Sequence, residues 1–579
     1  MAVKRVEIRS RQTFPFDCER IDGVIGFTVD PEDASNRAIA DLDLVAGRPV
    51  RFVADFVLLR PRSTSGRLLV NVVNRGRIFN LPFSIPSRPP SIGITDDIDA
   101  GDGFLLRRGW TILQCGWQWD VRRQPGLLGL EAPVADAPPG RLTVRFQPSE
   151  VHSEQLLSHW PLDPAPERCV ISHIPYPALD EGGRLTVRGD PNAAAVEIPA
   201  SAWRLLEGGN HIALQGGFQP GMVYEFSYLT ALTPVVGSGM LAVRDAAEHF
   251  GADAEATLGF GISQTGRFLR QFLHDGMNRT DAGRAAFDGL LPHVAGARRG
   301  EFNHRFAQPS AQHHVGPGHQ PPYATADLLR RAGAPVKVIE TNTSSEYWRS
   351  DCSWTHSEHP DLRQYLFAGT MHAPGLPILT DMPPDPTGVR GANPRNTVDY
   401  LPLLRAALIN LEAWVCEGVK PPPSAVPNPG CDRESVLEVF EGLAGAIRLD
   451  PLLLPRLPGA VAPVLVAAVD ADGNEIDGIC LPDLTVPLAT PTGWNPRHPS
   501  AGGVGQAVDM LGSTLPFPRT FSPRDSRRPI SHRYRSRDEY LERVEAEVAM
   551  LVAARHVLDE DVPVLCRHAE AAWRLFETT

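Results

Sequence analysis

An apolar run that passes through a Gly-x-Ser turn into a helical pattern constrains this chain more than any other feature. It lies at 256–276, in the stretch ATLGFGISQTGRFLRQFLHDG. The apolar run ends near Phe260, and the residues after Ser263 have the spacing of an amphipathic helix. A strand that turns directly into a helix is the building unit of a parallel sheet covered by helices. Such a turn would display Ser263 at the carboxyl end of the strand.

The turn differs by one position from the G-x-S-x-G elbow that presents a nucleophilic serine between a strand and a helix. Thr265 occupies the position of the second glycine, and Gly266 follows one residue later. Taken alone, the turn leaves two interpretations of Ser263: a catalytic nucleophile, or a serine that caps the helix.

Strand-like and helical patterns alternate on both sides of this turn, as in a parallel sheet. The last of the helical patterns is long and amphipathic, at 397–418. The expected strands lie at 48–59, 66–74, 110–117, 256–260, 287–296, 335–342 and 363–370. The alternation predicts an α/β fold with a mostly parallel central sheet flanked by helices.

Changes in pattern divide the chain into four predicted parts. Short strands separated by Pro/Gly turns indicate a β-rich insertion, and the proline-rich VKPPPSAVPNPG at 419–430 marks a boundary. The parts are a first section of the core at 1–120, the β-rich insertion at 121–225, a second section of the core with the catalytic residues at 226–425, and a C-terminal extension packed on the core at 426–579.

Composition excludes several classes of partner. The net charge of −12 is spread along the 579 residues without a basic stripe, so we expect no nucleic acid partner. No apolar run approaches the roughly 18 residues that span a membrane, so we expect no membrane partner. The N-terminus has no apolar segment typical of a secretory signal, and the eight cysteines are scattered, which predicts a cytoplasmic protein. The oligomeric state stays open.

The order of polar residues after Ser263 fits a catalytic triad. In the α/β-hydrolase arrangement the nucleophile, the acid and the histidine follow one another along the chain, each after a strand. The expected strand at 363–370 runs into His372, which we predict to be the general base. The strand at 335–342 runs into a loop with Glu346, the preferred acid, while Glu340 and Asp351 remain alternatives.

An oxyanion hole needs two backbone N–H groups aimed at the developing charge. We expect one from Gln264, the residue after the nucleophile, and the other from Arg75 or Gly76, at the end of the strand at 66–74. The alternative is that Asn-Arg-Gly at 74–76 forms only a turn that ends the strand.

Aromatic and polar residues near the same sheet edge are candidates for the substrate pocket. Trp117, Gln118 and Trp119 end the strand at 110–117, and Tyr347 follows the predicted acid. We predict that these four line the pocket, although aromatic residues here serve as often in hydrophobic packing.

Two further segments suggest metal binding, but other interpretations fit them better. The segment 300–323 is rich in Gly and Pro, and we favour a lid over the site; its histidines are His304, His313, His314 and His319. The segment DADGNEIDG at 470–478 lacks the glutamate of a calcium loop, so we favour a hairpin with an Asp-Gly turn. We therefore expect no metal and no cofactor.

Several stretches resemble a family of large bacterial α/β-hydrolase-domain proteins whose elbow reads G-x-S-Q-T-G-R. They are GFGISQTGRFLRQFLHDG, ETNTSSEYW, YLFAGTMH and, at 486–497, VPLATPTGWNPR. The resemblance covers most of the chain and implies Ser263 as nucleophile, His372 as base and Glu346 as acid. Many relatives have aspartate at the acid position, so glutamate is a departure.

These observations together predict a serine esterase. We expect it to cleave a small-molecule carboxylic ester or lactone through an acyl-enzyme intermediate with a Ser-His-Glu triad. The same residues would serve a lactonase, an amidase or an acyltransferase. An alternative of another class is a non-catalytic α/β-hydrolase scaffold used for binding.

Overall fold

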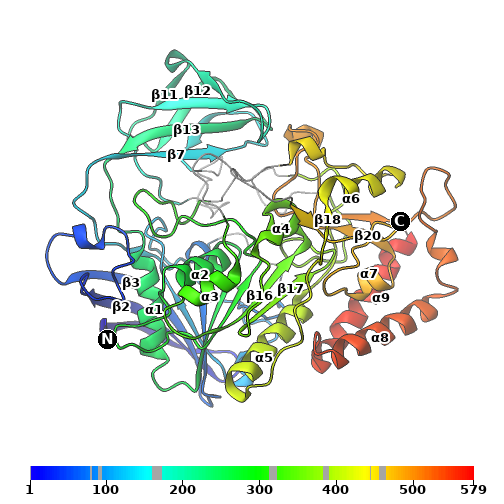
Figure 1. Ribbon diagram of the computed structural model, residues 1–579, viewed down its shortest axis with the longest axis horizontal. Coiled ribbons are helices and arrows are strands. Elements are labelled where there is room, and N and C mark those ends of the chain that lie inside the picture. Colours follow the sequence, from blue (N-terminus) through cyan, green and yellow to red (C-terminus); the bar gives the residue numbers. More distant parts are fainter. Residues whose placement is uncertain are drawn as a thin grey trace.

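A computed structural model describes residues 2–78, 81–88, 94–158, 173–311, 322–381, 390–443, 445–454 and 464–578. Its central sheet runs in the order β1-β2-β3-β5-β4-β14-β15-β16-β17, and β6 pairs with β3 at the side (Figure 1). The bounds of these strands are β1 Val3–Phe14, β2 Cys18–Val29, β3 Val50–Pro61, β4 Arg67–Val72, β5 Thr111–Cys115, β6 Leu130–Glu131, β14 Ala256–Ile262, β15 Gly289–His293, β16 Lys337–Thr343 and β17 Leu362–Phe367.

The strands from β5 to β17 pair in parallel, as the sequence predicts. Both faces of this part of the sheet are covered, so its strands are buried along most of their length rather than at alternate residues. Every residue of β15 is buried, and only the last residue of β14 is partly exposed. The α/β fold class is therefore confirmed.

The first three strands form an antiparallel wing on this sheet. Strands β1 and β2 were not among the expected strands. Most residues of β1 are exposed, and its sequence VKRVEIRSRQTF has no regular apolar alternation. A strand that is held by pairing to β2 rather than by a buried face leaves little hydrophobic signal in its sequence.

Helices pack on the parallel strands. Helix α1 (Ser238–Phe250) contacts β5, β4 and β3, while α2 (Gln264–His274) contacts β14, β15 and helix α3 (Thr325–Arg331). Helix α5 (Leu401–Glu417) also packs on β14, β15 and β16. The short helix α4 (Ser344–Arg349) directly follows β16.

A separate β-rich unit lies above the central sheet, at the top of Figure 1. Its two sheets have the orders β10-β9-β13-β7 and β11-β12-β8, and they enclose a core of their own around Phe146, Phe226 and Tyr228. The bounds are β7 Gly140–Phe146, β8 His152–Leu156, β9 Arg184–Arg188, β10 Val196–Ile198, β11 Trp203–Leu205, β12 His211–Phe218 and β13 Val223–Thr230. Strand β13 continues past 225, the predicted end of the insertion.

The C-terminal segment lies beside the β17 edge of the sheet, at the right of Figure 1, where Ile479 forms a bridge with Phe367. Tyr540 and Trp573, from its last two helices, belong to the main hydrophobic core, and Asp561 forms a buried 2.8 Å ion pair with Arg405 of α5. The bounds are α6 Arg433–Val439, α7 Pro482–Thr485, α8 Arg537–Ala553, α9 Val562–Thr578, β18 Cys431–Asp432, β19 Leu465–Val466, β20 Ala489–Thr492 and β21 Ser513–Pro516.

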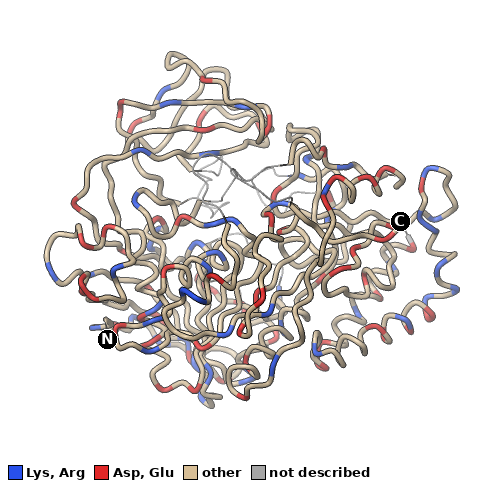
Figure 2. The backbone as a smooth tube through the Cα atoms, viewed as in Figure 1, with Lys and Arg blue, Asp and Glu red and all other residues tan. Residues whose placement is uncertain are grey.

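Charged residues of both signs are interspersed over the described chain rather than gathered by sign (Figure 2). Among the described residues, no helix combines the length and the apolar character that crossing a bilayer requires.

Candidate active site

Ser263 stands at the sharp turn between β14 and α2. Its backbone has φ 59° and ψ −112°, a conformation that is strained for a residue with a side chain. The turn is fixed by a 2.8 Å hydrogen bond from the N–H of Ser263 to the carbonyl of His293. The side chain is partly exposed and makes no capping hydrogen bond to α2. The interpretation of Ser263 as a helix cap therefore lacks the contact that would define it.

Thr265 and Gly266 explain why the second glycine comes late. The hydroxyl of Thr265 accepts a 2.8 Å hydrogen bond from the N–H of Ile262 and donates to its carbonyl at 3.0 Å, so this side chain closes the turn. A Cβ atom on Gly266 would lie 2.8 Å from the carbonyl oxygen of His293. The close approach of α2 to β15 thus falls at position 266 rather than at 265.

Glu346 and His372 form a buried hydrogen-bonded pair. Nδ1 of His372 donates to Oε1 of Glu346 at 2.6 Å, and the Glu346 side chain is fully buried. The other oxygen, Oε2, accepts from the N–H of Thr343 at 3.1 Å, in a capping box that starts α4. Burial acts to raise the pKa of Glu346, but His372 and Arg349 oppose it, and the net pKa lies below the ordinary value. A carboxylate held ionised in this way can orient the imidazole and stabilise its charged form.

The two alternative acids are engaged elsewhere. Glu340 lies within β16 and pairs with Arg270 at 2.8 Å. It also accepts a 2.6 Å hydrogen bond from Thr325. Asp351 is buried 3.6 Å from Arg433. Neither bonds His372, so the geometry favours Glu346.

The loop that carries His372 is held from several sides. The hydroxyl of Tyr400 donates to the backbone carbonyl of His372 at 2.8 Å. Asn396 donates to the carbonyl of Gly369 at 2.8 Å, and the N–H of Gly369 donates to Glu475 at 2.7 Å. Glu475 also accepts from the hydroxyl of Ser344, two residues before Glu346. One carboxylate therefore links the loops of the histidine and of the acid, a role that the sequence pattern did not indicate.

The turn at 74–76 ends β4 beside the strand of Ser263. Arg75 and Gly76 have left-handed φ values of 52° and 71°, and a Cβ atom on Gly76 would lie 2.6 Å from the carbonyl of Leu128. Arg75 donates from Nε to the carbonyl of Ser310 at 2.9 Å. Burial, together with Arg77, lowers the pKa of Arg75 to about 9. Gln264 is also buried, and its amide donates to the carbonyl of Pro309.

A family model described as Alpha/beta hydrolase domain matches residues 236–567, more than half of the chain. The chain belongs to this family. The match begins at α1 and includes the Ser263 turn, Glu346 and His372. The predicted α/β-hydrolase fold is therefore confirmed.

A solved structure of a promiscuous CE15 esterase from a marine bacterial metagenome is 12% identical over 60% of this chain and 70% of that one, with a TM-score of 0.23. No curated protein matches the chain.

The residues predicted to line the pocket of this α/β-hydrolase domain lie in different surroundings. Trp117 is 2% exposed and packs against Phe268 of α2, with its Nε1 donating to Val73 at 2.8 Å. The Trp117 ring therefore belongs to the hydrophobic core, where it packs against α2. Tyr347 is also buried and bonds His356 at 2.8 Å.

Gln118 and Trp119 contact residues outside the central sheet. Gln118 donates to the hydroxyl of Ser310 at 2.7 Å, and Trp119 packs against Tyr176 with ring centroids 4.6 Å apart. The same serine donates to Asp120 at 2.7 Å. Of the four predicted pocket residues, Gln118 is therefore the one that bonds the segment 309–310, which Arg75 and Gln264 also contact.

The histidine-rich segment is described only in part. His304 is within it, and burial lowers the pKa of its imidazole. His313, His314 and His319 lie outside the described residues. In the described ranges, no group of three or more His, Cys, Asp or Glu side chains is arranged to hold a metal. The turn at 470–478 is pinned by Asp470, which accepts from the N–H groups of Asp472 and Asn474 at 2.9 Å.

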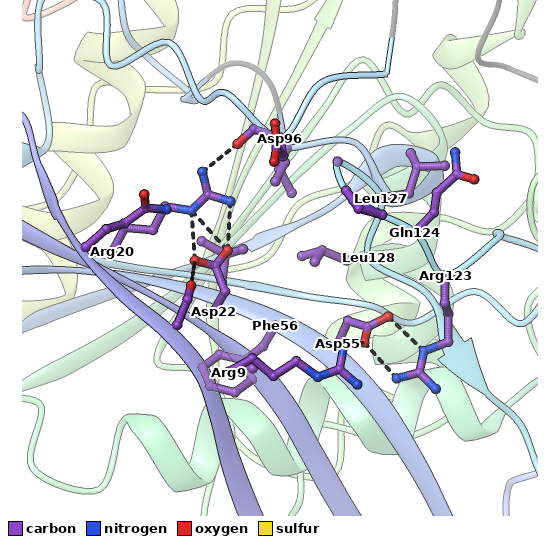
Figure 3. A pocket seen from close by; sticks show the side chains of 17 residues that line it. Arg9, Arg20, Asp22, Asp55, Phe56, Asp96, Arg123, Gln124, Leu127 and Leu128 are labelled. Atoms are coloured by element: carbon purple, nitrogen blue, oxygen red, sulfur yellow. Dashed lines mark hydrogen bonds and ion pairs between the residues drawn. The ribbon is translucent and has the colours of Figure 1, made fainter. Parts of the chain in front are cut away.

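An open groove of about 590 Å³ lies on the N-terminal strands (Figure 3). Its charged side chains pair with one another, Arg20 with Asp22 and Arg123 with Asp55, each at 2.7 Å. None of the predicted catalytic residues lines it, and we assign it no part in the site.

Proposed function

We propose that this α/β-hydrolase domain protein is a serine-dependent carboxylic-ester hydrolase. The observation that carries the proposal is the 2.6 Å hydrogen bond between His372 and the buried Glu346. These two residues follow the neighbouring strands β17 and β16, which belong to the same sheet as β14, the strand before Ser263. The strained, partly exposed serine and the ionised acid are what a nucleophile activated by a histidine requires.

In the proposed reaction, the other ring nitrogen of His372 takes the proton of the Ser263 hydroxyl as Ser263 Oγ attacks the ester carbonyl. Glu346 stabilises the imidazolium that forms. The backbone N–H of Gln264 and that of Arg75 or Gly76 stabilise the oxyanion. His372 then gives its proton to the leaving alcohol, and the acyl group stays on Ser263.

Deacylation follows the same path with water as the nucleophile. His372 takes a proton from water, whose oxygen attacks the acyl carbonyl, and returns the proton to Ser263 as the carboxylic acid leaves. The reaction consumes one ester and one water and needs no redox partner.

Labelling with a fluorophosphonate probe tests the nucleophile. We expect wild-type protein to be labelled and to hydrolyse p-nitrophenyl esters, and Ser263→Ala to lose both properties while keeping its melting temperature. The matched control is Ser500→Ala, a change at an exposed serine of the C-terminal segment. Absence of label on folded wild-type protein would favour a non-catalytic scaffold and overturn the proposal.

A further inference from the structure

A buried arginine lies one helical turn after the proposed nucleophile. The N–H of Arg267 donates to the carbonyl of Ser263 at 3.0 Å. Only 5% of Arg267 is exposed, and in the described part of the chain its Nε has no hydrogen-bond partner. A buried charge without a good partner destabilises the folded protein. An arginine kept at this cost beside the proposed nucleophile is suited to pair with a bound ligand.

The positive charges of other arginines act on Arg267. Burial lowers its pKa to about 9, and the charges of Arg349, Arg75 and Arg298 act in the same direction. Arg75 follows β4 and Arg349 follows β16, so they come from opposite sides of the strand that ends in Ser263. Positive charge is therefore collected at the sheet edge where the ester would bind.

The neighbouring arginines are engaged with the protein itself. Arg349 lies 3.8 Å from Oε1 of Glu346 and 3.5 Å from a carboxylate oxygen of Asp509. Arg298 donates to the backbone carbonyl of Arg349. The carboxylate that opposes the positive charge at Arg267 is Glu346, which already accepts the hydrogen bond of His372. This arrangement leaves Nε of Arg267 for a ligand.

We propose that Arg267 binds a free carboxylate of the substrate, so that the substrate is the half-ester of a dicarboxylic acid. This inference rests on the proposed esterase function. A guanidinium presents a planar fork of donors that matches a carboxylate, and a low-dielectric site strengthens the contact. One helical turn rises about 5.4 Å, which suits an acid group a few carbons away from the scissile ester.

The test compares two methyl esters with acyl chains of equal length, monomethyl glutarate and methyl valerate, by the release of methanol. We expect wild-type enzyme to prefer the half-ester. Arg267→Gln should raise KM for the half-ester and lower its kcat/KM by roughly 10- to 100-fold, with methyl valerate unchanged. Arg267→Lys should restore part of the preference, because the charge returns without the planar fork. The control Arg330→Gln, at an exposed arginine of α3, should change neither.

Two kinetic results would overturn the inference. One is equal turnover of both esters by the wild type; the other is an equal loss of kcat for both in Arg267→Gln, which would assign Arg267 to the reacting atoms. Melting temperatures show whether each variant is folded. Should Arg267→Gln fail to fold, Arg267→Lys decides: a rise in KM confined to the half-ester supports the inference, and unchanged kinetics contradict it.

A binding measurement separates this inference from the proposed function. If neither ester is hydrolysed, fluorophosphonate labelling still tests the esterase proposal, and calorimetric titration of glutarate into Ser263→Ala decides on the anion site. Binding that is lost when Arg267→Gln is added supports the site. No binding, or tighter binding of inorganic phosphate than of glutarate, contradicts a carboxylate site.

Discussion

Ser263 owes its candidate role to its backbone as much as to its hydroxyl group. A left-handed, strained φ costs about 1–3 kcal/mol and persists only where the surroundings hold it. Here Thr265 and the carbonyl of His293 provide those contacts.

At the same scale, the carboxylates of Glu346 and Glu340 are both fully buried but have different partners, a histidine and an arginine. This difference separates a proposed catalytic carboxylate from a structural one.

Replacing each of the two carboxylates tests that distinction. We expect Glu346→Gln to lower kcat by roughly 10²- to 10⁴-fold, because the amide no longer stabilises the imidazolium of His372. Glu340→Gln should instead lower the free energy of unfolding by about 3–5 kcal/mol, because Arg270 loses its buried partner. Steady-state kinetics and urea denaturation of both variants are the measurements. Wild-type turnover in Glu346→Gln would move the acid role to another residue.

At the scale of elements, the junction of β14, α2 and β15 sets the position of the serine. Gly261 and Gly266 let the first turn of α2 pack closely against the strand ends. A Cβ atom at 261 would lie 2.3 Å from the carbonyl of Thr265. The N-terminus of α2, with its partial positive charge, is thereby directed at the site.

Gly266→Ala tests this packing. The new Cβ atom would lie 2.8 Å from the backbone oxygen of His293 and 3.1 Å from the Cβ of Ala295. We expect α2 to shift, with a loss of about 1–3 kcal/mol in the free energy of unfolding and a fall in kcat of roughly 100-fold. Gly189→Ala is the matched control, because no atom lies within 4 Å of the position that its new Cβ would take. Equal behaviour of the two variants in denaturation and in ester hydrolysis would contradict the packing argument.

At the scale of the whole molecule, the C-terminal segment is tied to the loops of the proposed triad. Glu475 lies more than a hundred residues from both of its partners, Ser344 and Gly369, yet it is buried between them. The last two helices share the main hydrophobic core through Tyr540 and Trp573. The segment therefore supports the site and does not act as an independent appendage.

Glu475→Ala tests this support. Removal of the carboxylate leaves the N–H of Gly369 and the hydroxyl of Ser344 without their partner, so the loops of His372 and Glu346 should lose their relative positions. We expect kcat to fall by roughly 10- to 100-fold with little change in KM, the pattern of a positioning residue. Glu441→Ala, at an exposed glutamate of the same segment, is the control. A change in KM alone, or no change in kcat, would argue against this role.

Local sequence patterns were enough to predict the parallel strands and the helices between them. These strands contain apolar runs because the sheet is buried on both faces, and hydrophobic burial is the strongest signal that a sequence carries. Strand β1 was missed because pairing to β2, rather than a buried face, holds it. Strand β2 was missed although most of its residues are buried.

The sequence by itself determined the order of Ser263, Glu346 and His372 after successive strands, and hence the candidate triad. Only the tertiary structure decided that Glu346 rather than Glu340 bonds His372, that the ring of Trp117 is in the core, and that Arg267 is buried among other arginines. The physical reason is that order and periodicity are local properties of a chain. The partner of a buried charge comes from distant segments, which only the packed sheet brings together.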